Sequence, residues 1–364
     1  VESRGLGDVY KRQKSGNAVV FAPHPRAERT VRKTVKLLAM AAESAGLPQG
    51  AVSCLGTVSK EEIMALVGHP LTSLVIHTGA PGLLKASRDS GKPLICGGIG
   101  PSPVFIERTA DVKRAVGQII ASRSFDCGTS AAAEQYVVAD QQIAAQARQE
   151  MISQGAYFMN EEEEALLMDL LGPKGGREAE YMGKPAVWLA KRAGFQVPED
   201  IKVLVSQQKY ITDFNPYAGA LLCPVLVFYI ENDWMYACEK CMELLVNESC
   251  GHTLVIHSED QDVIRQFMLK KPVGRILINT PAAFGAMGAT TNLFPSMILG
   301  GLSAGLGITS DNVSPMNLVY MRNAAWGVRE VSELEGFDES GTGRTEAALD
   351  VTGLLKTILR QLED

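Results

Sequence analysis

The sequence contains few aromatic residues, no long hydrophobic run and no block of charge of one sign. Of its 364 residues 6% are aromatic, 21% charged and 46% apolar, a balance that excludes a disordered or collagen-like chain and suits about two globular domains. The longest apolar run, residues 219–230, is shorter than the roughly 20 residues needed to cross a membrane, so a buried strand is expected there. A net charge of −6 favours neither nucleic acid nor an anionic bilayer as a partner.

The cysteines show no disulfide or metal pattern. Their number is odd, and they are spread over a chain too large to need cross-links, which indicates a reducing cytosol: Cys54, Cys96, Cys127, Cys223, Cys238, Cys241 and Cys250. Cys238 and Cys241 form a Cys-x-x-Cys motif, but neither a second pair nor a His pair follows it. An ordinary amphipathic helix is therefore favoured over a metal or redox site. No apolar segment follows Lys11 and Arg12, so no secretory signal is expected.

The two ends of the chain differ from its middle. Residues 1–13 resemble translated linker sequence, and the strand pattern that follows begins abruptly, so a natural N-terminal portion is expected to be missing. Residues 336–344 are polar and Gly-rich, which predicts a linker. Residues 345–364 carry an apolar stripe from Val351 to Leu362 that predicts a short amphipathic helix. This helix either packs on its own protein or a sister subunit, or it is a detachable docking peptide.

Between the ends, strand and helix patterns alternate, which predicts an α/β fold, with the strands of residues 14–106 in one parallel sheet covered on both faces. Residues 14–106 form a first series, residues 107–315 a second, and 316–335 a return segment. The first series has expected strands at 18–21, 52–55, 73–77 and 94–96, with helices at 27–45, from a Ser59–Glu62 capping box, and near 82–89. The second has expected helices at 112–124, 141–154, 185–193 and 234–246, and strands at 136–139, 203–205, 224–229, 253–257 and 275–279.

One turn has the composition of a phosphate-binding loop. His77-Thr-Gly-Ala-Pro-Gly82 ends a predicted strand and opens a predicted helix. Glycines let the backbone approach a ligand closely, and a helix N-terminus favours a diphosphate. A tight turn without any ligand is equally compatible with this motif.

Several segments in the same order resemble the coenzyme A-acylating aldehyde dehydrogenases. This family includes the acetaldehyde and propionaldehyde dehydrogenases of bacterial microcompartments and the aldehyde half of bifunctional aldehyde-alcohol dehydrogenases. The segments are NAVVFAPHPRA (17–27), HTGAPGLLKASRDSGKPLICGGIGPSP (77–103), SFDCGTSAAAEQ (124–135), CPVL (223–226), GHT (251–253), RILINTP (275–281) and SDNVSP (310–315). The resemblance implies an aldehyde dehydrogenase fold: a Rossmann-like parallel-sheet domain, N-terminally truncated in this chain, and an α/β catalytic domain.

The resemblance also implies a thioester mechanism. A cysteine thiolate adds to the aldehyde, NAD accepts hydride, and coenzyme A removes the acyl group. His24 and Pro25 would border the adenosine, and the cofactor diphosphate would lie on Thr78, Gly79 and Gly82, with Gly98 as a further cofactor-site residue. Members that hydrolyse the thioester have a Glu before paired glycines, where this chain has Ile95-Cys-Gly-Gly98, so a thiol acceptor is expected.

The sequence departs from the family at the nucleophile. The family pattern places the catalytic cysteine at Ala131, and the nearest cysteine is Cys127, four residues earlier. Cys127 is therefore a relocated nucleophile, or a structural residue in an inactive chain, or the chemistry uses another group. Ala220 replaces a family Glu associated with nicotinamide ribose contacts, and Pro101 replaces an Asn.

The implied substrate is acetaldehyde or propionaldehyde, and the implied assembly is a homo-oligomer in the cytoplasm or inside a bacterial microcompartment. Residues 345–364 would bind shell proteins. The alternatives are a catalytically degenerate scaffold and a related acyl-phosphate or semialdehyde reductase. No metal site is expected. His252 and His257 flank a predicted buried strand, and His257 is expected to be a satisfied core or edge histidine rather than a ligand. Glu161–Glu164 are expected to form a solvated helix start.

Overall fold

The computed structural model describes residues 16–56, 59–78, 81–97, 102–173, 176–211, 217, 219–247, 252–301 and 307–330. The chain divides into two units, Val1–Val319 and Tyr320–Asp364. Both linkers predicted at 1–13 and 336–344, and the helix predicted at 345–364, lie outside the described residues. In the second unit, the described residues 320–330 contain no helix or strand.

The N-terminal region alternates strands and helices as predicted. Its elements are β1 (Val19–Phe21), the 3-10 helix η1 (Pro25–Ala27), α2 (Glu28–Ser44), β2 (Val52–Cys54), α3 (Lys60–Gly68), β3 (Val75–His77), α4 (Pro81–Asp89) and β4 (Leu94–Cys96). The capping box is confirmed, because the Ser59 hydroxyl accepts from the Glu62 N–H at 3.1 Å and the Glu62 carboxylate accepts from the Ser59 N–H at 3.3 Å. The four strands pair in parallel as two two-stranded sheets, β1–β2 and β3–β4, rather than as one sheet.

The larger sheet has seven parallel strands in the order β11-β10-β5-β6-β9-β8-β7. The strands are β5 (Ser102–Ile106), β6 (Glu134–Asp140), β7 (Ala156–Phe158), β8 (Val203–Gln207), β9 (Val225–Glu231), β10 (Thr253–His257) and β11 (Arg275–Ile278). The predicted α/β fold with parallel strands is confirmed. The predicted boundary at residue 106 puts β5 in the N-terminal region. In the structure β5 pairs instead with β6 and β10 of the larger sheet.

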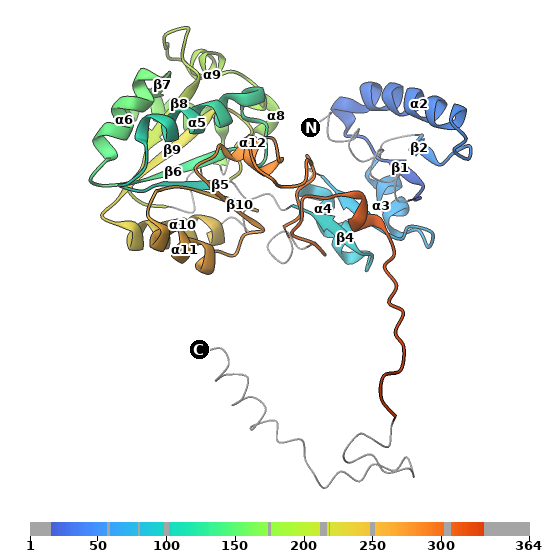
Figure 1. The fold of residues 1–364 in the computed structure, drawn as a ribbon. Helices are drawn as coiled ribbons and strands as arrows, with labels where there is room; N and C mark the ends of the chain where they lie inside the picture. The colour runs from blue at the N-terminus through green and yellow to red at the C-terminus, as the bar shows by residue number, and fades with distance from the viewer. Residues whose placement is uncertain are drawn as a thin grey trace. The chain divides into compact units, whose positions relative to one another are not determined.

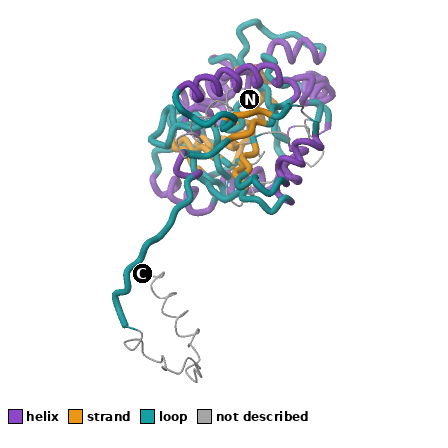
Figure 2. Tube along the Cα trace, turned by 90° about the vertical axis from the view of Figure 1, so that its right-hand side faces the viewer, coloured by secondary structure: helices purple, strands orange, loops and turns teal. Residues whose placement is uncertain are grey.

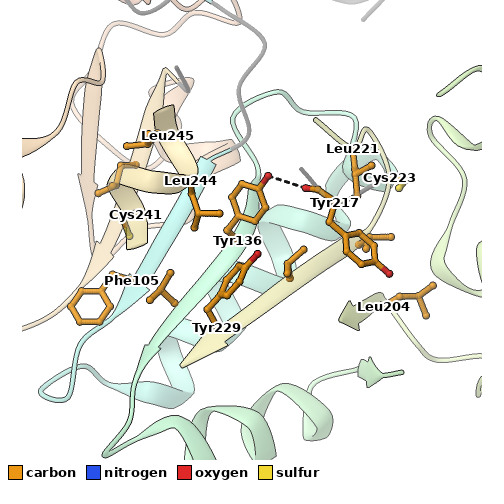
Figure 3. Close-up of a cluster of buried hydrophobic side chains, with 14 of the residues drawn as sticks. Phe105, Tyr136, Leu204, Tyr217, Leu221, Cys223, Tyr229, Cys241, Leu244 and Leu245 are labelled. Carbon is orange, nitrogen blue, oxygen red and sulfur yellow. Dashed lines mark hydrogen bonds between the residues drawn. The ribbon is translucent and has the colours of Figure 1, made fainter. Parts of the chain in front are cut away.

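Helices cover both faces of the seven-stranded sheet (Figures 1 and 2). One face carries α5 (Val112–Ser124), α6 (Ala144–Ser153) and α12 (Ala282–Ala286); the other carries α7 (Glu161–Leu171), α8 (Glu178–Tyr181), α9 (Ala186–Ala193), α10 (Trp234–Asn247) and α11 (Gln261–Lys270). Side chains alternate along a strand, so Phe105 and Tyr136 enter one core while Val104 and Val137 enter the other. Figure 3 shows the first of these two cores.

The apolar run 219–230 is not one strand, contrary to the prediction. Strand β9 begins at Val225, and Ile230 is 41% exposed. Polar side chains hold residues 219–222 in a non-strand conformation, as described below. None of the described helices has both the length and the apolar composition of a membrane-spanning segment.

Candidate active site

Three segments of the described chain meet at one edge of the seven-stranded sheet. Because the strands are parallel, the residues that precede β10, β6 and β9 all lie at the amino edge. These segments contain His252 before β10, the turn from Phe125 to Ala133 before β6, and residues 219–224 before β9. Neighbouring strands are about 4.8 Å apart, so the three segments lie within a few strand spacings of one another.

Cys127 lies in a tight turn directly after α5. The turn is a 3-10 segment, Phe125–Gly128, in which Asp126 has φ +48°, Cys127 +51° and Gly128 +76°. Two successive non-glycine residues with left-handed backbone are rare and cost about 1–2 kcal/mol each. Thr129 stabilises the turn by donating from its hydroxyl to the Asp126 carboxylate at 2.6 Å and from its N–H to the Asp126 carbonyl at 3.2 Å. Cys127 is half-buried and belongs to neither core cluster of the large sheet.

Gly128 brings this turn into contact with the segment before β9. A Cβ added at Gly128 would lie 2.5 Å from the carbonyl carbon of Cys223 and 2.9 Å from the nitrogen of Pro224. Only glycine therefore fits this position, for space as well as for its positive φ. The Cys127 turn and the Cys223–Pro224 peptide are in direct backbone contact.

Side chains from α5 and β6 hold the segment before β9. The Gln135 amide donates to the carbonyls of Tyr217 and Gly219 and accepts from the Leu221 N–H, at 2.8–2.9 Å. The Tyr136 hydroxyl donates to the Tyr217 carbonyl at 2.8 Å (Figure 3). The buried Arg123 guanidinium donates to the Leu221 carbonyl at 2.7 Å. The backbone groups that a strand would have paired are thus satisfied by side chains.

Glu134 is a buried carboxyl group three residues after Ala131. Its Oε1 accepts from the Ala282 N–H at 2.7 Å, which links the start of β6 to the start of α12. Burial raises the pKa of Glu134 to about 7, although the hydrogen bonds from the Ser122 hydroxyl and the Ala282 N–H act in the opposite direction. A carboxyl group with a pKa near neutrality can give or accept a proton.

His252, like Glu134, is a residue of this edge that was not predicted as part of the site. It is 2% exposed, and its Nδ1 lies 2.6 Å from the Thr253 hydroxyl and 3.4 Å from the Arg275 guanidinium. Its ring also borders Gly97 at the end of β4, because a Cβ added there would be 3.6 Å from His252 Cδ2 and 2.6 Å from the Leu299 carbonyl oxygen. Its position directly before a predicted parallel strand was the signal that could have identified it.

The predicted cofactor residues lie at the carboxyl ends of two N-terminal strands. His24 caps η1 after β1, where its Nδ1 accepts from the Arg26 N–H at 3.2 Å, and Pro25 is the first residue of η1. Thr78 follows β3 and is exposed. Gly82 is in the first turn of α4, and a Cβ there would meet nothing within 4 Å. Open space at this helix N-terminus is compatible with a bound diphosphate.

Other predicted positions are only partly described. Gly79, Gly98 and Pro101 lie outside the described residues, whereas Ala131 and Ala220 are both half-buried. Among the described hydrogen bonds, none joins His24 or Thr78 to the Cys127 turn. Within the described ranges, no group of three His, Cys, Asp or Glu side chains could hold a metal ion.

Two further expectations need correction. His257 is buried as expected, but its Nε2 has no hydrogen-bond partner within the described part of the chain, so it is not a satisfied core histidine. Glu161–Glu164 do start α7, with Asn160 and Glu163 forming a capping box. Glu164, however, is half-buried and accepts from the Ser206 hydroxyl at 2.8 Å, so it is more than a solvated residue of the helix start.

Comparison with known sequences gives consistent matches. The model of the aldehyde dehydrogenase family matches residues 14–161. The bifunctional aldehyde-alcohol dehydrogenase AdhE of Escherichia coli K12 is 36% identical over 317 residues, which are 86% of this chain and 36% of that protein. The acetylating succinate-semialdehyde dehydrogenase of Clostridium kluyveri is 30% identical over 84% of this chain and 67% of its own length. The chain thus spans about a third of the bifunctional relative.

Solved structures of the same kind share the fold. An acetylating aldehyde dehydrogenase from Geobacillus thermoglucosidasius has a TM-score of 0.86 and 38% identity over 90% of this chain and 73% of its own. A propionaldehyde dehydrogenase from the fucose utilisation microcompartment of Clostridium phytofermentans has a TM-score of 0.79 and 27% identity, covering 87% and 71%. The propionaldehyde dehydrogenase of Rhodopseudomonas palustris, solved with bound CoA and an acylated cysteine, has a TM-score of 0.75 and 25% identity, covering 84% and 68%.

The parallel sheets and these matches define an α/β protein with the aldehyde dehydrogenase fold. The chain belongs to the aldehyde dehydrogenase family, and the relatives that it matches include acetylating members.

Proposed function

We propose that the chain catalyses the NAD-dependent, CoA-acylating oxidation of a short aldehyde such as acetaldehyde or propionaldehyde, with Cys127 as the nucleophile. The observation that carries this proposal is the placement of Cys127. Its half-buried thiol lies in the turn at the amino edge of the large sheet, in contact through Gly128 with the segment before β9. The acylated cysteine of the Rhodopseudomonas palustris propionaldehyde dehydrogenase supports a cysteine mechanism for this class.

Residues at the amino edge of the large sheet have different roles in this reaction. The Cys127 thiolate attacks the aldehyde carbonyl carbon, and the acyl group remains on its sulfur as a thioester until the CoA thiol takes it. When bound, the nicotinamide cofactor accepts the hydride. Glu134 and His252 are the titratable groups that take up or return protons beside the turn. Hydrolytic members have a Glu directly before their paired glycines, and this chain has Cys96 before Gly97 and Gly98. No carboxylate is therefore present at that position to activate water.

We assign cofactor binding to the carboxyl ends of β1 and β3. His24 and Pro25 border the adenosine, while the diphosphate lies on Thr78, Gly79 and Gly82 at the start of α4, with Gly98 nearby. The exposure of Thr78 and the open space at Gly82 support this assignment. Dinucleotides bind at the carboxyl ends of parallel strands and at helix N-termini in this way.

The second candidate function is that of a binding or scaffold protein that has lost its chemistry. Ala131 at the family nucleophile position and Ala220 at the family Glu position both favour this alternative. A semialdehyde reductase is a third candidate, supported by the similarity to the succinate-semialdehyde dehydrogenase of Clostridium kluyveri. The three differ in substrate, and in whether any cysteine is acylated.

Coenzyme A-dependent NADH formation from acetaldehyde, propionaldehyde and succinate semialdehyde separates these candidates. We expect Cys127→Ser to lower kcat/KM by about a thousandfold or more, because serine is a much weaker nucleophile at neutral pH. Cys54→Ser is the matched control, because Cys54 is also half-buried but lies in the N-terminal region. Turnover unaffected by Cys127→Ser would remove this cysteine from the mechanism, and no turnover on any of the aldehydes would favour the scaffold.

A cysteine at the family position tests the relocation directly. If the turn has been rebuilt around Cys127, Ala131→Cys in the Cys127→Ser background should restore only part of the activity, because a displacement of about 1 Å from the attack geometry is costly. Full recovery would show instead that the rest of the site still fits position 131.

We also propose that the protein forms homo-oligomers and that residues 345–364 bind a microcompartment shell, as the Clostridium phytofermentans homologue comes from such a compartment. Deleting residues 345–364 should release the enzyme from shells and leave its turnover unchanged. Equal encapsulation with and without these residues would refute the role of this segment.

A further inference from the structure

A buried lysine contacts the first cysteine of the Cys-x-x-Cys motif. Lys271 directly follows α11, and its Nζ donates to Cys238 Sγ on α10 at 2.7 Å and to the Cys238 carbonyl oxygen at 2.8 Å. Lys271 is 8% exposed and Cys238 is 7% exposed. Figure 1 shows α10 and α11 on the same face of the seven-stranded sheet.

Cys238 provides both of the hydrogen bonds that the described residues show for this amino group, one through its sulfur and one through its carbonyl oxygen. In the part of the chain that the structure describes, no carboxylate lies within 4.0 Å of Lys271 Nζ. Two acidic side chains of this region pair with another lysine, because Lys240 lies 3.5 Å from both Glu231 and Glu243. The remaining contact of Lys271 is the face of the Phe267 ring, 4.8 Å away. A buried ammonium needs a compensating partner, and here Cys238 provides it.

Cys241, the second cysteine of the motif, is less suited to react. It is completely buried, and burial raises the pKa of its thiol to about 12, even though the nearby Lys271 charge acts to lower it. The two cysteines are also three residues apart on one helix, where Cβ atoms are about 5–6 Å apart, whereas a disulfide needs about 3.5–4.5 Å. Lys271 Nζ is already in contact with the Cys238 sulfur.

We propose that Cys238 and Lys271 form a peroxide-sensitive modification site, at which oxidation of the sulfur produces a covalent S–N bond between α10 and the segment that follows α11. Peroxides oxidise cysteine sulfur, and the Lys271 Nζ, 2.7 Å from the Cys238 Sγ, is already in position to attack the oxidised sulfur. Because Cys238 as a whole is only 7% exposed, we expect small oxidants such as hydrogen peroxide to reach its sulfur and bulky thiol reagents to be excluded.

The reaction balances with hydrogen peroxide as the only oxidant. The Cys238 thiolate attacks one peroxide oxygen, the O–O bond breaks, and a sulfenic acid forms as hydroxide leaves. The hydroxide takes a proton from the Lys271 ammonium and becomes water. The neutral amine then attacks the sulfur, the S–O bond breaks, and a second water leaves. The sulfur is oxidised by two electrons, and one peroxide is reduced to two waters.

Peptide mapping of the peroxide-treated full chain tests this site without using enzymatic activity. Trypsin cleaves after Lys240, which separates Cys238 from Cys241, and after Lys270, which leaves Lys271 on peptide 271–275. We expect the peptide that ends at Lys240 to be joined to peptide 271–275, lighter than their sum by two hydrogen atoms, and to be released by dithiothreitol. A joined pair with an added oxygen is the same site oxidised by a second peroxide.

Matched variants make the test decisive. Lys271→Arg keeps the cation beside the sulfur but removes the attacking amine, so the joined pair should be lost; Lys270→Arg makes the same change at the neighbouring exposed lysine and should retain it. Cys241→Ser should also retain it. Thermal melting confirms that each variant is folded. A disulfide from Cys238 to Cys241, sulfinic acid without the joined pair, or an unmodified Cys238 would overturn the proposal.

Discussion

The seven-stranded sheet and the N-terminal region are built from the same kind of alternating elements but differ in how much they bury. Strands β5, β6 and β10 are buried along their whole lengths, whereas the four N-terminal strands have three residues each and those of β3 are all only half-buried. Helix α2 buries one residue, Val35, and leaves Leu37 59% and Met40 58% exposed. The amino edge that contains Cys127 therefore rests on a complete core, while the residues proposed to bind the cofactor lie in a thinly packed region.

This difference explains how strain is tolerated at the Cys127 turn. Left-handed residues persist only where the surroundings determine them strongly. At the amino edge these surroundings are the buried side chains of Arg123, Gln135 and Tyr136 and the close contact at Gly128. No comparable set of side chain to backbone contacts surrounds His24 or Thr78 within the described residues. We therefore expect substitutions in the two regions to have different costs.

The largest expected difference is between two glycines. Gly128→Ala should lower the free energy of unfolding by about 4 kcal/mol and remove activity, because it combines a positive φ with a backbone clash at Cys223. Gly82→Ala, in the open first turn of α4, should raise it by up to about 1 kcal/mol. Urea unfolding measures both. Equal effects would mean that the turn is not constrained as described.

The pH dependence of stability gives a smaller effect, confined to the larger sheet. Burial raises the pKa of Glu134 to about 7, so the folded chain holds a proton that the unfolded chain has lost, and stability falls as pH rises from about 4.5 to 7. Burial and the Arg114 charge lower the pKa of His257 to about 4, so the folded chain lacks a proton that the unfolded chain binds. Stability therefore rises as pH rises from about 4 to 6.5.

The contributions of Glu134 and His257 to the pH dependence of stability have opposite signs and nearly cancel in the native chain. Replacing either residue alone should therefore reveal the contribution of the other. Glu134→Gln should leave stability rising with pH across this window, and His257→Gln should leave it falling, each by up to about 3 kcal/mol. Exposed Glu162→Gln is the control and should leave the profile unchanged. Melting curves from pH 4 to 8 measure the slopes; identical profiles for the two buried-site variants would contradict the assigned directions.

The smallest expected difference is between the same substitution, valine to alanine, in the two regions. Val137→Ala removes a fully buried side chain from β6 and should cost about 2 kcal/mol. Val35→Ala removes one from a cluster of three buried residues in a helix that alanine favours, so it should cost about 1 kcal/mol or less. If Val35→Ala costs as much as Val137→Ala in urea unfolding, the N-terminal region is better packed than its exposed residues indicate.

Local signals in the sequence predicted much of the fold. The bounds expected for α5 and β10 are those observed, because apolar periodicity and the short strand length are local properties. The Ser59–Glu62 capping box was predicted for the same reason. Helix α11, in contrast, was not predicted, and residues 219–222 were predicted as strand. Their conformation depends on Gln135 and Arg123, which lie far away in the sequence.

The site was less predictable because local sequence patterns do not determine the order of strands in a sheet. The order β10-β5-β6-β9 brings His252, the Cys127 turn and residues 219–224 to one edge, and no spacing in the sequence gives this order. The shift in the pKa of Glu134 likewise depends on complete burial, which a single sequence does not show. The sequence did show directly that position 131, where the family pattern places its cysteine, is an alanine.

The most direct test of Cys127 as the nucleophile is to map the acyl group after the chain is incubated with propionyl-CoA in the absence of NADH. Under these conditions the thioester forms from the product side and accumulates. We predict one acyl group, on the tryptic peptide that contains Cys127, and none in Cys127→Ser. An acyl group on Cys223 or another cysteine, or no acylation at all in folded protein, would contradict it.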